Sequence, residues 1–468
     1  MAGRKLRADR GHNSQPQDHN QQFGLIDRTY RFDDQLDDTT VASAVVHPAT
    51  GPLWASDAAV RIRPLLAPAL PERFGAGRIP AAAVVRPAPQ SVLVVGSGGV
   101  RNLGDDATTS TTIRRLRSLL DPSVGIEVIT DGPRPSGDYA PGVWLGTVRE
   151  FANRPLDHHL AVLISGGGTL SQEFPAAGAS RQAVAAEAAR GGVPVLLSGQ
   201  GIGPFDRDPA EIRALLGQAV AVSVRDPLSA RVAADLGATN VAITGDDATE
   251  PGEAPARPDA LRLVGDAGWL AFNGRLAGYS EADLGELTAW ASAVDEAAGQ
   301  RGLEVVAVAQ NRQPPWEVET LSALAERSRH AAWHVLDVTD DLPLARAVYG
   351  LAVGVVARSF HAACFGLAAG VPTLLPAGGG YYRAKADGLA ELAGLPSEFS
   401  DDAPPADGAE VHRRLAAVAP VVARRPLDGI DAAITAWLVA QLGALGVPLA
   451  AGYGANPSAS TSPATTVT

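Results

Sequence analysis

The sequence predicts an α/β fold with two Rossmann-like, doubly wound domains of similar size. From about residue 90 onward, short apolar runs alternate with longer amphipathic runs, and the alternation restarts after one Pro- and Glu-rich stretch. Continuous apolar strands separated by helices are typical of parallel sheets that are covered on both faces. A length of 468 residues also fits two or three domains of ~100–200 residues each.

The apolar runs predict six strands in the first domain, at residues 91–95, 125–130, 160–165, 193–198, 219–224 and 240–243. Five more are expected in the second domain, at residues 269–273, 304–309, 334–336, 354–357 and 373–375. Helical patterns lie at residues 111–120, 281–299, 317–328, 342–349, 362–369 and 427–445. Ligands of such sheets bind beyond the carboxyl ends of the strands, so we expect the site in the cleft between the domains.

The remaining segments divide the chain around these two domains. Residues 1–88 are polar and then Ala/Pro-rich, which indicates a largely disordered or loosely packed extension. The N-terminal domain is expected at 89–248, a linker at 249–261 and the C-terminal domain at 262–448. Residues 449–468 carry no charge and are rich in Ser, Thr and Pro, which predicts a disordered tail.

Composition excludes several classes of protein. A net charge of −12 argues against a nucleic-acid binder, although a small site in an acidic protein can still be positive. The single cysteine, Cys364, excludes an intrachain disulfide and a multi-cysteine metal site. We see no secretory signal and no apolar run of the ~18–20 residues that a membrane span requires, so we expect a cytoplasmic protein.

Glycine-rich segments follow three predicted strands of the first domain. They contain the candidate binding residues Asn102, Gly104 and Asp105, then Gly167 and Gly168, then Gln200 and Gly201. A single segment of this kind is commonly structural, and Asp105 could simply cap the next helix. Three of them at one sheet edge predict a pocket lined by backbone N–H groups for a polar or anionic ligand.

Arginines follow predicted strands in both domains. Arg225 either pairs with Asp226 or another carboxylate, or it holds a carboxylate or phosphate of a ligand with its planar guanidinium. In the second domain, Asn273 and Arg275 end the first strand and place a further arginine at the same cleft.

The segment from Arg358 to His361 leaves a buried strand and opens a helix of small residues. A lone histidine is more often structural, but beside Arg358 at a strand end we interpret His361 as a proton donor or acceptor. Cys364, one turn further, is interpreted as a small buried hydrophobic residue. Lys385 either contacts an anion or is a surface charge.

The adjacent pair His158 and His159 is interpreted as part of a surface loop. Neighbouring residues do not converge on one metal ion without further ligands. We therefore expect no metal site in the chain.

Together these segments resemble the polysaccharide pyruvyl transferase family over about residues 90–395. The motifs are N-x-G-D at 102–105, G-G-G-x-L at 166–170, G-Q-G-I-G-P at 199–204, S-V-R-D at 223–226 and R-x-x-H at 358–361. The resemblance implies two Rossmann-like domains facing a cleft, as in glycosyltransferases of the B type. It also implies transfer of pyruvate from phosphoenolpyruvate onto two sugar hydroxyls, which forms a cyclic ketal and releases phosphate.

The resemblance further implies a role for each of the main candidate residues. Arg225 and Arg358 would bind the anionic donor, Arg275 or Lys385 would support them, and His361 would act as acid and base. Asp105 or Asp226 would orient His361 or bind sugar hydroxyls. No cofactor is expected besides the donor substrate. The acceptor would be an exopolysaccharide or cell-wall glycan, with peripheral association to a lipid-linked form.

Two other classes of function remain open from the sequence. A glycosyltransferase that uses a nucleotide sugar would share the two-domain cleft, and Glu391 would be available for the ribose. A relative without catalytic activity would only bind an anion or a partner. A dinucleotide-dependent oxidoreductase has less support because the G-x-G-x-x-G fingerprint is missing.

Overall fold

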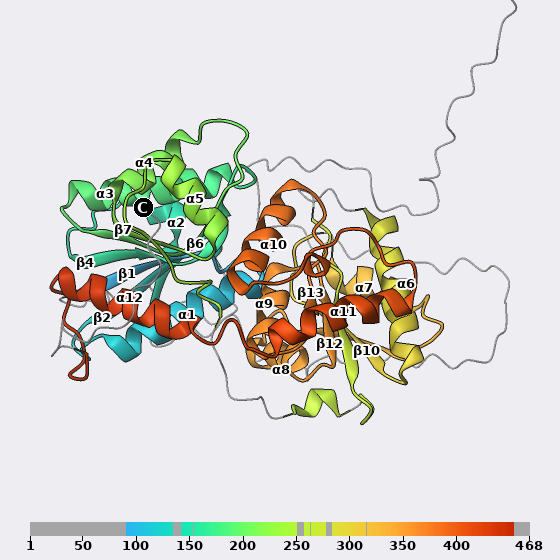
Figure 1. The fold of residues 1–468 in the computed structure, drawn as a ribbon. Coiled ribbons are helices and arrows are strands. Elements are labelled where there is room, and N and C mark those ends of the chain that lie inside the picture. Colours follow the sequence, from blue (N-terminus) through green and yellow to red (C-terminus); the bar gives the residue numbers. More distant parts are fainter. Residues whose placement is uncertain are drawn as a thin grey trace, which may run out of the picture. The chain divides into compact units, whose positions relative to one another are not determined.

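A computed structural model describes residues 90–133, 142–151, 153–249, 257–262, 264–277, 283–314 and 316–453 (Figure 1). The predicted extension at 1–88 lies outside these residues, as do the middle of the predicted linker and residues 454–468. Both sheets described below belong to one compact unit. Within the described part of the chain, no helix has the length and apolar character that crossing a bilayer requires.

The first sheet is parallel, with the strand order β3-β2-β1-β4-β6-β7-β8 and with β5 paired to β6. Its strands are β1 (Ser91–Gly96), β2 (Gly125–Thr130), β3 (Val143–Thr147), β4 (His159–Ile164), β5 (Gly167–Leu170), β6 (Val195–Ile202), β7 (Ala219–Val224) and β8 (Val241–Ile243). Its helices are α1 (Leu103–Leu119), α2 (Val148–Phe151), α3 (Pro175–Arg190), α4 (Ala210–Gln218) and α5 (Pro227–Asp235). Helices cover both faces, with α3, α4 and α5 opposite α1 (Figure 1).

The second sheet is also parallel, in the order β11-β10-β9-β12-β13. Its strands are β9 (Trp269–Asn273), β10 (Glu304–Ala309), β11 (Trp333–Asp337), β12 (Gly354–Ala357) and β13 (Thr373–Leu374). The helices that follow the linker are η2 (Asp259–Leu261), α6 (Leu284–Gln300), α7 (Glu317–Ala325), α8 (Leu342–Gly350), α9 (Phe360–Ala368), α10 (Gly380–Ala393), η3 (Ser397–Phe399), α11 (Gly408–Val422) and α12 (Ile430–Ala444). The predicted α/β class with two doubly wound parallel sheets is confirmed.

Two glycine-rich segments that we expected to be loops are partly strands. Gly167 pairs with Gln200, and Leu170 pairs with Ile202, so β5 adds to the sheet and β6 continues beyond Ser198. The prediction missed this because glycine weakens a strand pattern read from side chains alone. The backbone there is nevertheless hydrogen-bonded, which fixes the position of these glycines.

The helix after β1 begins earlier than its apolar pattern indicates. Asn102 is the N-cap of α1, and its side-chain oxygen accepts a hydrogen bond from Gly104 N at 3.2 Å. Gly104 and Asp105 therefore lie in the first helical turn, and Asp105 is not the cap. Its carboxylate is left available for other contacts.

The chain returns to the first sheet at its end. Asp431 of α12 forms an ion pair with Arg115 of α1 at 2.6 Å, and Leu449 forms an isolated bridge with Leu120. Figure 1 shows α12 running beside α1. Because Ala450 N also donates to Leu119 O at 2.8 Å, the first residues of the predicted tail belong to the packed structure.

The interpretation of His159 as a surface residue is wrong. Its side chain is fully buried at the start of β4, where Nε2 lies 2.7 Å from Glu127 Oε2 and Nδ1 lies 3.1 Å from Leu156 O. Ser91 also donates to the same Glu127 carboxylate. Only His158 is exposed, with 43% of its side chain accessible.

Replacing His159 with Leu should lower the free energy of unfolding by about 2–3 kcal/mol, because a buried carboxylate would lose a charge-assisted hydrogen bond. The bond to His159 is the main reason why the pKa of Glu127 is lowered. Its contribution is therefore present above the unfolded-state pKa and is lost as the pH falls through the folded-state pKa. Urea denaturation followed by circular dichroism measures the change. The matched variant His158→Leu should shift the value by less than about 0.5 kcal/mol, and equal effects would contradict this account.

Candidate active site

His361 lies where the carboxyl ends of the two sheets meet. It is in the first turn of α9, whose N-cap Ser359 is hydrogen-bonded to Gln310. A Cβ on Gly104 would collide with the imidazole ring. Leu103 N donates to Gln310 O at 3.0 Å beside this contact. The predicted binding residue Gly104 therefore lets the start of α1 pack directly against His361.

Three cations face the buried imidazole. Burial and the charges of Lys385, Arg225 and Arg275 together hold the pKa of His361 well below its usual range. Its position near the positive end of α9 acts in the same direction. The free site therefore keeps His361 neutral, and an anion placed among the three cations would favour its protonated form.

The pairing of Arg225 with Asp226 that the sequence allowed is present, and its role in ligand binding stays a prediction. Its Nε donates to Asp226 Oδ2 at 3.2 Å, and its guanidinium lies over the ring of Phe360, 4.1 Å from the centroid. A Cβ on Gly201 would collide with the guanidinium, so this glycine makes room for it. The buried Nη1 has no hydrogen-bond partner among the described residues, which leaves one donor available for a ligand.

Lys385 lies among aromatic rings rather than at the open surface. Its Nζ is 4.3 Å from the ring centroid of Tyr381 and 5.8 Å from those of Phe360 and Tyr382. Tyr381 in turn donates its hydroxyl to Gly168 O at 2.8 Å, which ties α10 to the glycine-rich segment of the first sheet. Burial and the charge of Arg225 lower the pKa of Lys385 to about 7.

Asp105 is the carboxylate that faces Lys385. Burial raises its pKa to about 7, and the charge of Lys385 opposes that shift. No described residue donates a hydrogen bond to this carboxylate, whereas Gly99 N donates to the adjacent Asp106 at 2.9 Å. An acid and a base with such closely matched pKa values can exchange a proton near neutral pH.

Arg275 supports the same cluster from the segment that follows β9. It pairs with the buried Glu317 at 3.2 Å, and its Nε donates to the Tyr382 hydroxyl at 3.3 Å. Asn273 is the last residue of β9, and its Nδ2 donates a hydrogen bond to Val308 O at 2.9 Å. Asn273 therefore holds strands together, while Arg275 keeps its charge close to Lys385.

Two of the predicted site residues, Arg358 and Gln200, have polar partners within the protein. Arg358, expected to bind the donor, forms its ion pair with Glu286 of α6 at 3.2 Å, and it is not one of the charges that shift the pKa of His361. Gln200 donates its amide to three backbone carbonyls, those of Ile164, Ser165 and Ser198. Both residues stabilise the ends of strands, and no contact of the described residues brings either to His361.

Sequence reasoning missed two aspartates that follow β8. Asp247 is fully buried and accepts hydrogen bonds from Gly166 N at 2.8 Å and Ser198 Oγ at 3.0 Å. Asp246 has its Oδ1 3.8 Å from His361 Nε2. Their position after a strand was the available signal, because the same rule had selected Arg225.

Cys364 is 1% exposed, and burial raises the pKa of its thiol well above the usual range. The prediction that it is a small buried hydrophobic residue is confirmed. Its thiol is not activated as a nucleophile.

Among the described residues, one group combines ligand atoms at metal-binding separation: Glu127, His158 and His159, within 4.8 Å of one another. The 2.7 Å between Glu127 Oε2 and His159 Nε2 is a hydrogen-bond distance. Two ligands of a tetrahedral zinc ion would be about 3.4 Å apart. The group therefore fits a hydrogen-bonded core pair better than a metal site.

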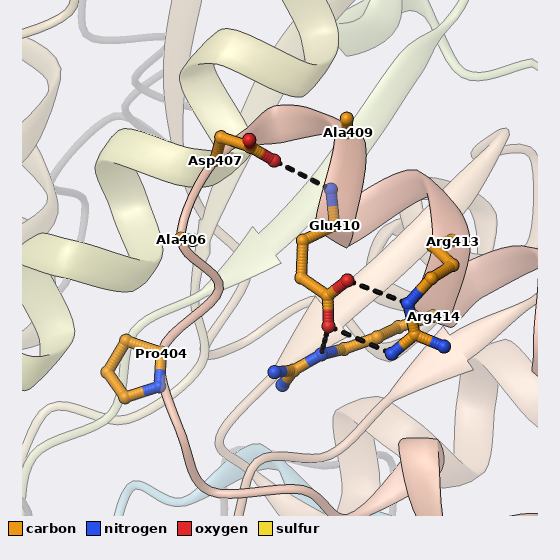
Figure 2. Close-up of a pocket in the computed structure, with 7 residues that line it drawn as sticks. All are labelled: Pro404, Ala406, Asp407, Ala409, Glu410, Arg413 and Arg414. Atoms are coloured by element: carbon orange, nitrogen blue, oxygen red, sulfur yellow. Dashed lines mark hydrogen bonds and ion pairs between the residues drawn. The ribbon is translucent and has the colours of Figure 1, made fainter.

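A pocket at α11 does not offer a better anion site. It is lined by Pro404, Ala406, Asp407, Ala409, Glu410, Arg413 and Arg414. Figure 2 shows both arginines turned toward the Glu410 carboxylate. Their hydrogen bonds lower the pKa of Glu410 to about 2, so the positive charge of this pocket is already neutralised.

Acylation by acetic anhydride should modify Lys385 with an apparent pKa of about 7. Lys5, the only other lysine of the chain, is the internal reference, and peptide mass spectrometry separates the two rates. Asp105→Asn should lower this pKa because it removes a favourable negative charge. Arg275→Gln should raise it because it removes a repulsive positive charge. A pKa near the ordinary lysine value of ~10.4 would show that the amine is not held among these charges.

Comparison with known proteins agrees with this architecture. No curated protein sequence matches the chain significantly. The S. aureus MnaA–UDP complex is 12% identical with a TM-score of 0.53, covering 76% of this chain and 97% of that one. The Neisseria meningitidis UDP-GlcNAc 2-epimerase bound to UDP-GlcNAc is 12% identical with a TM-score of 0.51, covering 76% and 100%. These likenesses establish the glycosyltransferase-B-like fold.

The model of the family described as "Polysaccharide pyruvyl transferase" matches residues 102–375, more than half of the sequence, and the chain therefore belongs to that family.

Proposed function

We propose that this protein transfers pyruvate from phosphoenolpyruvate to two hydroxyls of a glycan, with release of phosphate. The observation that supports this most directly is that Arg225 and Lys385 both lie over the ring of Phe360, the neighbour of His361. Their charges and that of Arg275 lower the pKa of His361, in addition to its burial. Phosphoenolpyruvate brings a carboxylate and a phosphate on three carbons. Such a compact polyanion matches cations that come from three different elements, with the open Nη1 of Arg225 as one donor.

Donor binding also prepares the acid–base groups. Negative charge among the three cations would raise the pKa of His361 and let the imidazole hold a proton. Asp105 and Lys385, both with pKa values of about 7, would provide a proton acceptor on the other side. The free enzyme would thus be unable to protonate a substrate until the donor is in place.

Two successive attacks by sugar hydroxyls on the same carbon would form the ketal. One sugar hydroxyl attacks C2 of the enol, its proton passes to Asp105 or Lys385, and the methylene carbon takes a proton from His361. The second hydroxyl attacks the same carbon and the C–O bond to phosphate breaks. The phosphate leaves with the proton held by Asp105 or Lys385, and neutral His361 accepts the second hydroxyl proton. Asp226 is less suited to hold the sugar, because it pairs with Arg225 and caps α5 through Ser229 N at 2.7 Å.

A glycosyltransferase that uses a nucleotide sugar is the second candidate. The two structural relatives above are complexes with UDP and with UDP-GlcNAc, and the fold is shared. Glu391, which this alternative would make available for the ribose, accepts two 2.7 Å hydrogen bonds from Arg231. Its carboxylate is therefore already bound, which favours the pyruvyl transfer.

Calorimetry should detect saturable binding of phosphoenolpyruvate, and Arg225→Gln should weaken it at least about tenfold, because a charge-assisted hydrogen bond contributes about 1.5–3 kcal/mol. Arg190→Gln, an exposed arginine on α3, is the matched control and should bind as the wild type does. UDP-glucose is titrated in parallel. Binding of UDP-glucose without binding of phosphoenolpyruvate would favour the nucleotide-sugar alternative.

His361→Ala should retain donor binding and lose turnover by about 100-fold or more, the range of general acid–base catalysis. Phosphate release with a panel of pyruvylatable glycans measures turnover, and calorimetry measures donor affinity. His334→Ala, at the opposite end of the second sheet in β11, should leave turnover unchanged. Full activity of the His361 variant would remove this residue from the mechanism.

A further inference from the structure

The carboxylate of Asp246 lies between two buried nitrogens, and three buried polar atoms of this group have no hydrogen-bond partner. They are His361 Nε2, Arg225 Nη1 and Asp246 Oδ2, all of them among the buried unpartnered atoms of the described residues. Asp246 Oδ1 lies 3.8 Å from His361 Nε2, and Asp246 Oδ2 lies 3.9 Å from Arg225 Nη1. Leaving one such atom unpaired costs about 1–3 kcal/mol, so three together at one point indicate a site built for use.

The backbone fixes where this carboxylate points. Asp246 Oδ1 accepts a hydrogen bond from Ala248 N at 2.9 Å, and the residue is 3% exposed. Its neighbour Asp247 faces the other way and has its oxygens occupied by Gly166 N and Ser198 Oγ. The two consecutive buried aspartates therefore have different roles. Asp247 holds the glycine-rich segment, and Asp246 lies between Arg225 and His361.

We propose that Asp246 is a positioning residue that orients His361 and Arg225 for the reaction. This inference rests on the proposed function. Asp246 accepts the Nε2 proton of His361 and fixes the imidazole in one tautomer. That leaves Nδ1, beside the side-chain-free Gly104, to exchange a proton with a reactant. The other oxygen of Asp246 holds the free Nη1 of Arg225 toward the donor.

The environment of Asp246 and His361 lowers the free-energy cost of sharing a proton between them. Burial raises the pKa of Asp246, opposed by Arg225, while burial and Lys385 lower the pKa of His361. The two values therefore move toward each other. A carboxylate that orients a catalytic imidazole through one nitrogen follows the logic of the serine protease triad, here with different neighbours.

Nitrogen NMR of the full-length protein, labelled with ¹⁵N-histidine, tests the contact without an activity assay. The chain has nine histidines, and the spectrum of His361→Gln assigns the resonance. At slightly alkaline pH we expect His361 to carry its proton on Nε2. The Nδ1–H tautomer in the wild type would overturn the proposal, and this measurement needs no Asp246 variant to fold.

The variants Asp246→Asn and Asp247→Asn remove the same charge from adjacent buried positions. Asp246→Asn should shift the His361 resonances and lower kcat by about 100-fold. Because Asp246 also orients Arg225, donor KM should rise as well, by a smaller factor than kcat falls. Asp247→Asn should leave the His361 resonances in place even where it lowers stability. Equal effects of the two variants, or wild-type kcat in Asp246→Asn, would refute the role of Asp246. Failure of the wild type to bind phosphoenolpyruvate would refute the proposed function instead, while the NMR result would still decide whether Asp246 orients His361.

Discussion

The site depends on the close approach of α1 to the imidazole of His361. Gly104 has no side chain, so the first turn of α1 can lie directly against the ring, and Leu103 N pairs with Gln310 O next to it. This contact brings a helix of the first sheet to a helix start of the second. Asp105, one residue further, consequently faces Lys385 of α10. A larger residue at position 104 would separate the acid–base groups as well as the helices.

Glycine has the same function at two further points of the site. Gly201 leaves space for the guanidinium of Arg225, and Gly168 lies against Lys385 and Tyr381. Each glycine thus faces a cation or imidazole. From the sequence, these glycines were predicted to contact a ligand through their N–H groups. The structure shows a further role: their small size leaves room for charged side chains. The strands β5 and β6 hold Gly168 and Gly201 in place through backbone pairing.

Much of the fold follows from periodicity, and part of the site follows from the rule that strand ends carry function. That rule selected Arg225, Arg275 and His361, which the structure brings together. It also selected Arg358, but nothing local in the sequence shows that Glu286, 72 residues away, forms an ion pair with it. The role of Tyr381 was not predictable either, since its hydroxyl meets Gly168 O from 213 residues away. Such pairings are set by the packing of two sheets.

Ion pairs and shifted pKa values explain why the site carries many charged groups but, without a donor, no strong acid or base. Arg225 and Arg275 each have a carboxylate partner, Asp226 and Glu317, so their net field is moderate. Lys385 lies among aromatic rings and has its pKa lowered to about 7, and Asp105 has its pKa raised to the same value. Lys385 and Asp105 are therefore near the midpoint of their titration at neutral pH, where a small change in local charge alters their protonation most. A compact polyanion supplies such a change, and it acts on His361, Lys385 and Asp105 at once. Binding and proton transfer are thereby coupled through charge, without requiring movement of the backbone.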